Sequence, residues 1–393
     1  MDNPKIRPLE AIPIETEEGK MVYLRDPLQV MDKPLIVNPA TFFLLCLMNG
    51  SADVRDIQVA FLRRFGQLVQ SAEIERLVKS LDDSYLLDNE RFRARQAEMI
   101  AEFRAQTVRK PTSVGICYPA DPEELKKFLW GFFEDRPQPK DRRLSGFVVP
   151  HIDLRRGGRS FARVYREAAE GPPPQRALIL GTCHSGQGLL FNATRKDFET
   201  PLGVVETDKD AVESLASACS FDLLLGEYSH KQEHSIELQT VFLKLLFPEI
   251  KIVPVLVGSF AEFTEREGGP RGDERVESFV AGARKLLAEP CWVIASADLS
   301  HVGRRFGDEA PVSPSLVESE DRALLEHVAA GDADGFHLHD VRTRGRYKVC
   351  GVPPIYVLLR ILEGKGGRVV SYEQSPERET QSLVTFAGVV FDA

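Results

Sequence analysis

The chain has 393 residues, which is long enough for two or three domains of the usual length of roughly 150 residues. Hydrophobic residues make up 43% and charged residues 28%, a composition typical of globular proteins and not of disordered chains. Lys and Arg total 50 against 59 Asp and Glu. The net charge of −9 argues against a general nucleic-acid binder, because neutralising phosphates needs a basic face.

The first residues contain no basic segment followed by an apolar one, so no secretory signal is expected. The longest apolar stretch, residues 42–48, is far too short to cross a membrane. Six cysteines are scattered without a C-x-x-C pair, which indicates reduced thiols in a chain that is not exported. We therefore expect a cytoplasmic protein with neither a membrane nor a nucleic-acid partner.

Residues 1–90 are expected to form a small winged-helix-like domain. Residues 35–37 are typical of a strand, and apolar side chains at helical spacing predict helices near residues 54–61 and 74–81, with Gly66 between them. The second helix carries more acidic than basic side chains, which excludes DNA binding through it.

This pattern resembles the small winged-helix domains of the PqqD type, which recognise peptides. The alternative is a module that only packs or docks, because helix pairs of this size are common. Residues 91–110 are rich in charge and are expected to form a linker helix that leads into the main domain at residue 111.

Residues 111–393 alternate short apolar runs with helical patterns. This alternation predicts an α/β domain with a mostly parallel sheet and helices on both faces. The expected buried strands are residues 147–149, 177–180, 252–257 and 292–295, and the expected helices are residues 158–170, 211–218, 235–247, 276–288 and 354–362.

Histidines follow three of the expected strands. His151 comes directly after the first strand, His184 follows the second, and Asp298 and His301 follow the fourth. Ligands of open α/β sheets bind beyond the carboxyl ends of the strands, so these side chains are expected to share one site. Imidazole is both the commonest metal ligand and the usual acid or base near neutral pH, so a metal site and a metal-free acid/base site both remain open.

Cys350 bears on that choice. It stands directly before an apolar helix, and a helix N-terminus lowers the pKa of a thiol. Cys350 could therefore supply a thiolate as ligand or nucleophile. The alternative is an inert buried cysteine.

The segment from His230 to His234 fits H-x-x-E-H, a zinc-protease pattern. Ser229 is a candidate helix cap, which would put both histidines in the first helical turn and not mid-helix, so we do not favour a protease. Glu233 and His234 are instead expected to line the main site. The remaining histidines lie in a polar stretch and are expected to be solvated: His327, His337 and His339.

Together these residues resemble the Memo family, whose bacterial members are called AmmeMemoRadiSam system protein B. The resemblance covers residues 111–393 and runs through segments spread in the same order along the chain: Cys117-Tyr118-Pro119-Ala120-Asp121, Pro150-His151, Gly181-Thr182-Cys183-His184, Glu233-His234-Ser235-Ile236-Glu237, Ser296-Ala297-Asp298-Leu299-Ser300-His301 and Cys350-Gly351. The family is similar in fold to class III extradiol dioxygenases, which hold non-haem iron with two histidines and a carboxylate.

By this resemblance His151, His184 and Cys350 are metal ligands, and His301 takes the place of the dioxygenases' acid/base histidine. We expect Asp298 to orient His301. The resemblance implies iron or copper as the metal, with zinc as an alternative, and redox chemistry. It also implies a non-enzymatic role in binding phosphotyrosine peptides. For bacterial members it implies a radical S-adenosylmethionine (radical SAM) protein and an AMMECR-type protein as partners.

The chain departs from the family at two places. The family's usual Pro-His-Ala-Gly-Tyr is replaced by a sequence that puts Asp153 beside the first ligand, and Cys183 stands where the family often has Ser. Both are expected to lie at the pocket. A thiolate in place of a carboxylate is softer and favours copper(I), zinc or a redox-tuned iron over catechol ring cleavage.

The leading hypothesis is a metal-binding protein with oxidoreductase chemistry that acts with a radical SAM and AMMECR-type system. The alternative is a non-enzymatic module that binds a peptide or protein through a degenerate dioxygenase-like pocket.

Overall fold

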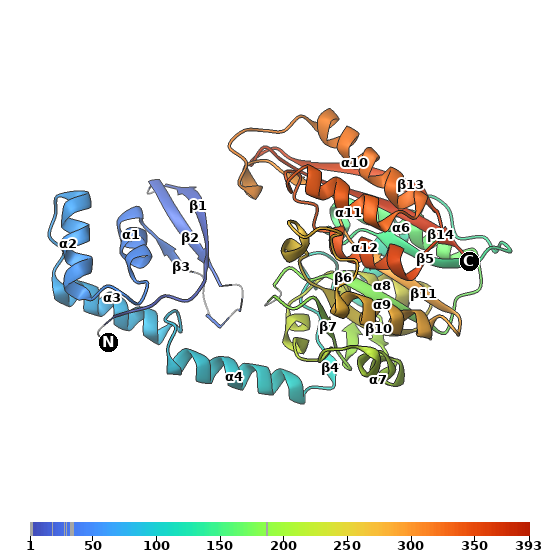
Figure 1. Cartoon of the computed structure of the whole chain (residues 1–393), viewed down its shortest axis with the longest axis horizontal. Helices are drawn as coiled ribbons and strands as arrows, with labels where there is room; N and C mark the ends of the chain where they lie inside the picture. The colour runs from blue at the N-terminus through green and yellow to red at the C-terminus, as the bar shows by residue number, and fades with distance from the viewer. Residues whose placement is uncertain (1–2, 18, 27, 29, 32–34, 186–187) are drawn as a thin grey trace. The chain divides into compact units, whose positions relative to one another are not determined.

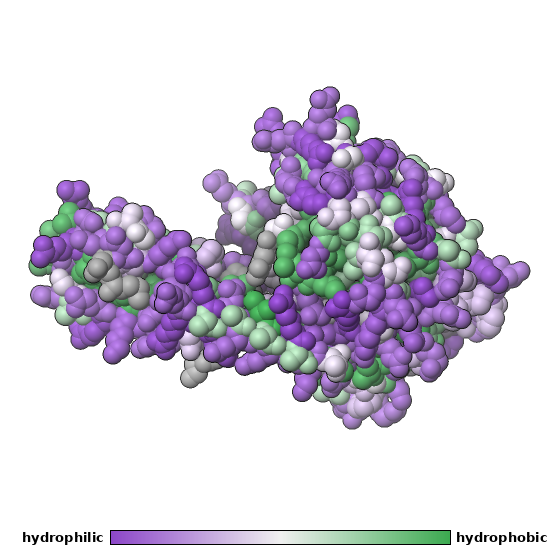
Figure 2. Space-filling view, turned by 60° about the horizontal axis from the view of Figure 1, so that its bottom comes forward, coloured by the Kyte–Doolittle hydropathy of each residue, from purple (hydrophilic) through white to green (hydrophobic). Residues whose placement is uncertain are grey.

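A computed structural model describes the chain except for residues 1–2, 18, 27, 29, 32–34 and 186–187. It divides into two compact units, Met1–Ala105 and Gln106–Ala393 (Figure 1). Within the described residues no helix is both long and apolar enough to span a membrane. Hydrophilic side chains cover most of the face seen in Figure 2, with smaller apolar areas between them.

The described residues of the first unit form a three-stranded antiparallel sheet and four helices. The strands pair in the order β1 (Glu10–Thr16), β2 (Gly19–Arg25) and β3 (Leu35–Val37). The helices are α1 (Pro39–Leu47), α2 (Val54–Phe65), α3 (Ser71–Asp83) and α4 (Glu90–Ala105). Apolar side chains of α1, α2 and α3 pack with those of β2 and β3 in one core. Gly66 ends α2 in the left-handed conformation, which glycine adopts at little cost.

The second unit is an α/β domain, as the sequence predicts, and its large sheet is mixed. Eight strands form it, in the order β12, β14, β5, β11, β6, β10, β7, with β13 paired to β14. The four central strands are parallel: β5 (Leu144–Val149), β11 (Cys291–Ser296), β6 (Arg176–Thr182) and β10 (Lys251–Val257). The strands around them are antiparallel: β7 (Phe191–Ala193), β12 (His301–Val302), β13 (Gly367–Glu377) and β14 (Ser382–Asp392).

Alternate side chains of the central strands enter two different cores. In β6, for example, Leu178 and Leu180 join one core, while Ala177 and Ile179 join the other. The first core is covered by helices that include α7 (Lys209–Ala218), α9 (Glu274–Leu286), α10 (Pro314–Ala330), α11 (Ala333–Arg342) and α12 (Val352–Ile361). The second is covered by α5 (Pro122–Trp130), α6 (Leu154–Ala169) and α8 (Glu237–Leu246). Helices therefore lie on both faces of the sheet, as predicted (Figure 1).

A small second sheet joins β4 (Val108–Arg109), β8 (Asp197–Thr200) and β9 (Gly203–Val205). It brings Arg109 against Glu237 at the start of α8, and both side chains are fully buried in an ion pair. Burial alone would raise the pKa of Glu237, but the Arg109 guanidinium and hydrogen bonds that include one from the Thr112 amide outweigh it and lower that pKa. This ion pair therefore joins β4, the first strand of the unit, to the first residue of α8.

Candidate metal centre

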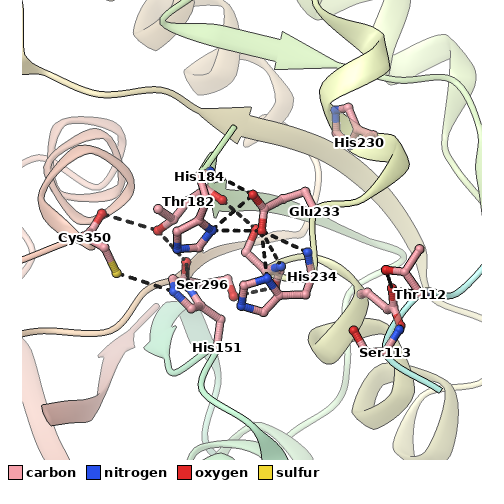
Figure 3. Close-up of polar contacts among 12 residues, drawn as sticks. Thr112, Ser113, His151, Thr182, His184, His230, Glu233, His234, Ser296 and Cys350 are labelled. Atoms are coloured by element: carbon pink, nitrogen blue, oxygen red, sulfur yellow. Dashed lines mark hydrogen bonds and ion pairs between the residues drawn. The ribbon is translucent and has the colours of Figure 1, made fainter. Parts of the chain in front are cut away.

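Three potential ligands from separate parts of the chain converge at the carboxyl ends of the central strands (Figure 3). His151 follows β5, His184 follows β6, and Cys350 precedes α12. One ligand atom from each lies within 4.8 Å of the others. This edge of the sheet is where α/β domains bind ligands, because the strand ends and the following loops form a crevice there.

His151 is 2% exposed and is held from both sides of its ring. Its Nδ1 lies 3.0 Å from the Ser296 carbonyl oxygen, which only accepts, so Nδ1 donates and Nε2 is left as the ligand atom. Nε2 lies 3.4 Å from the Cys350 sulfur. Burial alone would lower the pKa of His151, but the Asp298 carboxylate and Cys350 outweigh it and raise that pKa to about 9.

His184 is oriented by the carboxylate of Glu233. The Nδ1 atom of His184 lies 3.0 Å from Glu233 Oε1, and its backbone N–H donates to Oε2 over 2.8 Å. Burial alone would raise the pKa of Glu233, but the imidazoles of His184 and His234 hold it well below its usual value. An ionised carboxylate accepts the Nδ1 proton of His184, which leaves the opposite ring nitrogen free to bind a metal.

His234 shares the same carboxylate and lies next to both histidine ligands. Its Nδ1 lies 3.2 Å from Glu233 Oε1. Its ring stacks on that of His184 at 5.1 Å between centroids and meets the ring of His151 edge-on at 5.4 Å (Figure 3). His184, Glu233 and His234 also form a group whose ligand atoms lie within 4.8 Å of one another. The structure therefore brings four ligand-type side chains and one orienting carboxylate together.

The surroundings of Cys350 favour its thiolate form. Burial alone would raise its pKa, but His151 and His301 outweigh burial and hold that pKa well below the usual value. The residue stands two positions before α12, whose N-terminus also favours negative charge. A thiolate beside two oriented imidazoles is a soft donor set of the kind that binds copper(I), zinc or iron.

Arg109 holds the segment that carries Glu233 and His234 through hydrogen bonds to its backbone. The guanidinium donates to the backbone carbonyls of His230 over 3.0 Å and Glu233 over 2.8 Å. The sequence-based expectation that Ser229 caps a helix here is wrong. A short 3₁₀ helix covers Glu227–Lys231, and α8 begins only at Glu237, after His234.

His230 is therefore separate from the cluster. It is buried, its Nε2 donates to the Asn192 carbonyl over 2.8 Å, and Figure 3 shows it well away from His234. Burial lowers its pKa to about 4. The H-x-x-E-H pattern does not form a protease-like histidine pair, because its two histidines lie on a 3₁₀ turn and in a loop and not on one face of an α-helix.

Asp298 contacts the first ligand and not His301, contrary to the expected pairing. Its Oδ1 accepts the backbone N–H of His151 over 2.9 Å, and its Oδ2 lies 3.7 Å from Nε2 of the same residue. The reason is topological, since β11 lies directly beside β5. His301 begins β12, its Nδ1 bonds the Leu299 carbonyl over 3.0 Å, and its ring packs edge-on against Phe306.

The two positions that depart from the family pattern differ in their placement. Asp153 caps α6 by accepting the Arg155 N–H over 2.8 Å, and it belongs to neither group of ligand-type side chains. Cys183 is buried and lines a cavity of about 300 Å³ together with Thr182, His184 and Cys350. Two of the three candidate ligands, His184 and Cys350, therefore line this cavity.

The sequence reasoning missed the polar residues behind the ligands. Gln239 donates to the Pro150 carbonyl and to the Ser296 hydroxyl, both over 2.7 Å, and so connects the ends of β5 and β11. The Ser296 hydroxyl in turn donates to the Ser235 carbonyl over 2.6 Å. A glutamine within an apolar helix pattern was the one signal that could have indicated this role.

The comparisons with known proteins identify the family of the chain. A family model described as "Memo-like protein" matches residues 109–390. A MEMO1 family protein of Aquifex aeolicus is 32% identical over 99% of this chain and 99% of its own length. The MEMO1 family protein TTHA0924 of Thermus thermophilus is 29% identical, covering 84% of this chain and 96% of its own.

The MEMO1 family protein MK0963 of Methanopyrus kandleri is 32% identical over 72% of this chain and 98% of its own length. The Aquifex relative therefore matches both units of this chain, while the match to the Methanopyrus relative accounts for a share close to that of the α/β unit. The family match covers the strands and loops that carry all of the candidate ligands. The chain belongs to the Memo family.

Proposed function

We propose that the chain binds a metal ion through His151, His184 and Cys350 and uses it in oxidoreductase chemistry, with iron or copper as the metal and zinc as a redox-inert alternative. The observation that carries the proposal is the convergence of two imidazoles and one thiol within 4.8 Å.

The side chains of the site suit a bound metal ion. Each histidine offers one ring nitrogen to the site because an acceptor holds the other: the Ser296 carbonyl for His151 and the Glu233 carboxylate for His184. Orienting partners of this kind are typical of metal-binding histidines. The low pKa of Cys350 supplies the deprotonated sulfur that a metal requires.

An iron or copper ion bound there would supply one-electron redox chemistry. The residues of the chain hold the site in shape and move protons. Glu233 and the Ser296 carbonyl lie at the Nδ1 atoms of the two histidines and so direct the opposite ring nitrogens to the site, and His234 offers a further nitrogen beside the ligands for accepting or donating a proton. We assign His301 a second acid/base role from the Cys350 side, because it is among the groups that lower the pKa of that thiol.

Metal analysis after anaerobic purification tests the proposal. We expect close to one ion per chain in the wild type and in the His327→Ala control, which changes a histidine outside both ligand groups, and far less in His151→Ala and Cys350→Ser. Equal metal content in all four proteins would overturn the metal assignment. Iron or copper that is reversibly oxidised and reduced in place supports the redox part, and a chain that binds only zinc refutes it.

The partners stay part of this proposal: a radical SAM protein and an AMMECR-type protein. Support comes from the resemblance of residues 111–393 to bacterial Memo proteins and from the presence of a second compact unit, Met1–Ala105, in the same chain. We expect a tagged full-length chain to retain a co-expressed radical SAM protein under reducing, anaerobic conditions. A partner that is retained equally by an unrelated tagged protein would count against it.

A further inference from the structure

The cavity of about 300 Å³ beside the metal centre extends from the ligands to helix α11. His184 and Cys350 line it, and so do His337 and Asp340 of α11. The other lining residues include the apolar Val257, Phe260 and Pro353. This volume is at the lower end of the range for small-molecule sites.

Asp340 of α11 is the one acidic side chain among the described residues that line this cavity. Among the described residues that line the cavity, none is Lys or Arg. The Asp340 side chain makes no hydrogen bond or ion pair in the described part of the chain. Burial raises its pKa to about 6, against a smaller lowering of that pKa by the neighbouring His339. Glu320 and Asp321 line a smaller cavity that Asp340 also borders, and there Glu320 pairs with His339.

His337 lines the same cavity. The expectation that it is solvated is wrong, since it is 6% exposed and packs against Phe260 and Tyr356. No hydrogen bond of normal geometry reaches either ring nitrogen within the described residues. Burial lowers its pKa, so His337 is neutral and adds no positive charge that could satisfy Asp340.

We propose that this cavity binds a small organic cation, with the ammonium group of the ligand at Asp340 and a metal-binding group at its other end near His184 and Cys350. The inference rests on the proposed function, because it names the class of substrate for the same site. Desolvation of an unpaired, half-buried carboxylate is unfavourable, and a bound ammonium ion would offset it through a charge-assisted hydrogen bond.

The hydrogen bond between the ammonium group and Asp340 sets the expected difference in affinity. A hydrogen bond to a charged group contributes enough to change affinity by about tenfold or more. We therefore expect an ammonium ligand to bind about tenfold or more tightly than the alcohol of equal length, and this preference should depend on Asp340.

The test uses full-length protein loaded with zinc and titrated calorimetrically. The probes are aminoethanethiol, aminopropanethiol and aminobutanethiol, each compared with mercaptoethanol, mercaptopropanol or mercaptobutanol of the same chain length. At one chain length at least, the wild type should prefer the amine about tenfold, and Asp340→Asn should abolish that preference while it leaves binding of the alcohol unchanged. Glu326→Gln, an exposed carboxylate on the neighbouring helix α10, is the matched control and should keep the preference.

Equal binding of amine and alcohol at all three lengths in the wild type would overturn the inference, as would a preference that survives in Asp340→Asn. Zinc content is measured in each sample, so a failure of metal binding is seen separately. If the protein holds no zinc, butylamine against butanol on the metal-free protein tests the same preference, and equal binding there overturns the inference on its own.

Discussion

Glu233 is the residue whose replacement distinguishes an oriented metal centre from an accidental cluster of histidines. Its carboxylate accepts the backbone N–H groups of His184, His234 and Ser235 as well as Nδ1 of His184. Substitution of Glu233 by Gln keeps the shape of the side chain but replaces one acceptor oxygen with an NH₂ donor.

The structure indicates which oxygen would be lost. Oε1 accepts from more groups than Oε2, so the remaining oxygen of a glutamine is expected at the Oε1 position. The NH₂ group would then face the backbone N–H of His184, where two donors repel each other. The His184 ring would also lose its ionised acceptor. Loss of such an orienting partner typically weakens metal binding by about 10- to 100-fold, or about 1.4–2.8 kcal/mol.

The assay is competition for zinc between the protein and a chelating dye at constant pH. Glu326→Gln serves as the control because it removes a carboxylate from an exposed position. We expect Glu233→Gln to bind zinc about 10- to 100-fold more weakly than both the wild type and this control. Unchanged affinity in a folded Glu233→Gln protein would refute the reasoning, since His184 would then need no carboxylate to present its free nitrogen.

Three further predictions concern stability. Burial raises the pKa of Asp340 from 3.8 to about 6, so the folded protein binds this proton more tightly than the unfolded chain does. The resulting contribution to stability, up to about 3 kcal/mol, is present below pH 3.8 and is lost as the pH rises through 6. Asp340→Asn should therefore be more stable than the wild type in urea at about pH 8 and nearly equal to it at about pH 4, and an equal difference at both values would contradict this. Glu237→Gln leaves the buried Arg109 without an anionic partner and should cost about 3–5 kcal/mol of unfolding free energy, whereas a loss below about 1 kcal/mol would show that the pair is not needed. In Gly146→Ala the new Cβ would clash with the Val293 carbonyl oxygen, so β5 and β11 must separate and the thermal midpoint should fall by several degrees; an unchanged midpoint would mean that the strands can shift freely.

The sequence was most informative where apolar runs end in polar residues. The central strands are buried on both faces and read as continuous apolar segments, so their carboxyl ends, and with them His151 and His184, could be located. Cys350 could be connected to them only through the family resemblance, because it lies far along the chain and no periodicity brings it to the same edge.

Elements whose partners are distant or exposed escaped prediction. Strands β1 and β2 are mostly exposed and form a hairpin without a continuous apolar pattern. Strand β14 lies between β12 and β5 because it pairs with residues more than two hundred positions earlier, such as Val390 with Phe147. The roles of Asp298 and Glu233 depend on backbone N–H groups that converge only in the folded chain, and the side-chain sequence carries no signal for such bonds.

Titration with cobalt(II) tests the metal centre most directly, because a cobalt–thiolate bond produces a strong sulfur-to-metal charge-transfer absorption that histidine and carboxylate ligands do not. The account predicts that this absorption saturates at one cobalt per chain in the wild type. It should vanish in Cys350→Ser and persist in Cys183→Ser, since Cys183 lines the cavity but belongs to neither group of ligand-type side chains. The absence of the absorption in the wild type, or its persistence in Cys350→Ser, would contradict the assignment of Cys350 as a metal ligand.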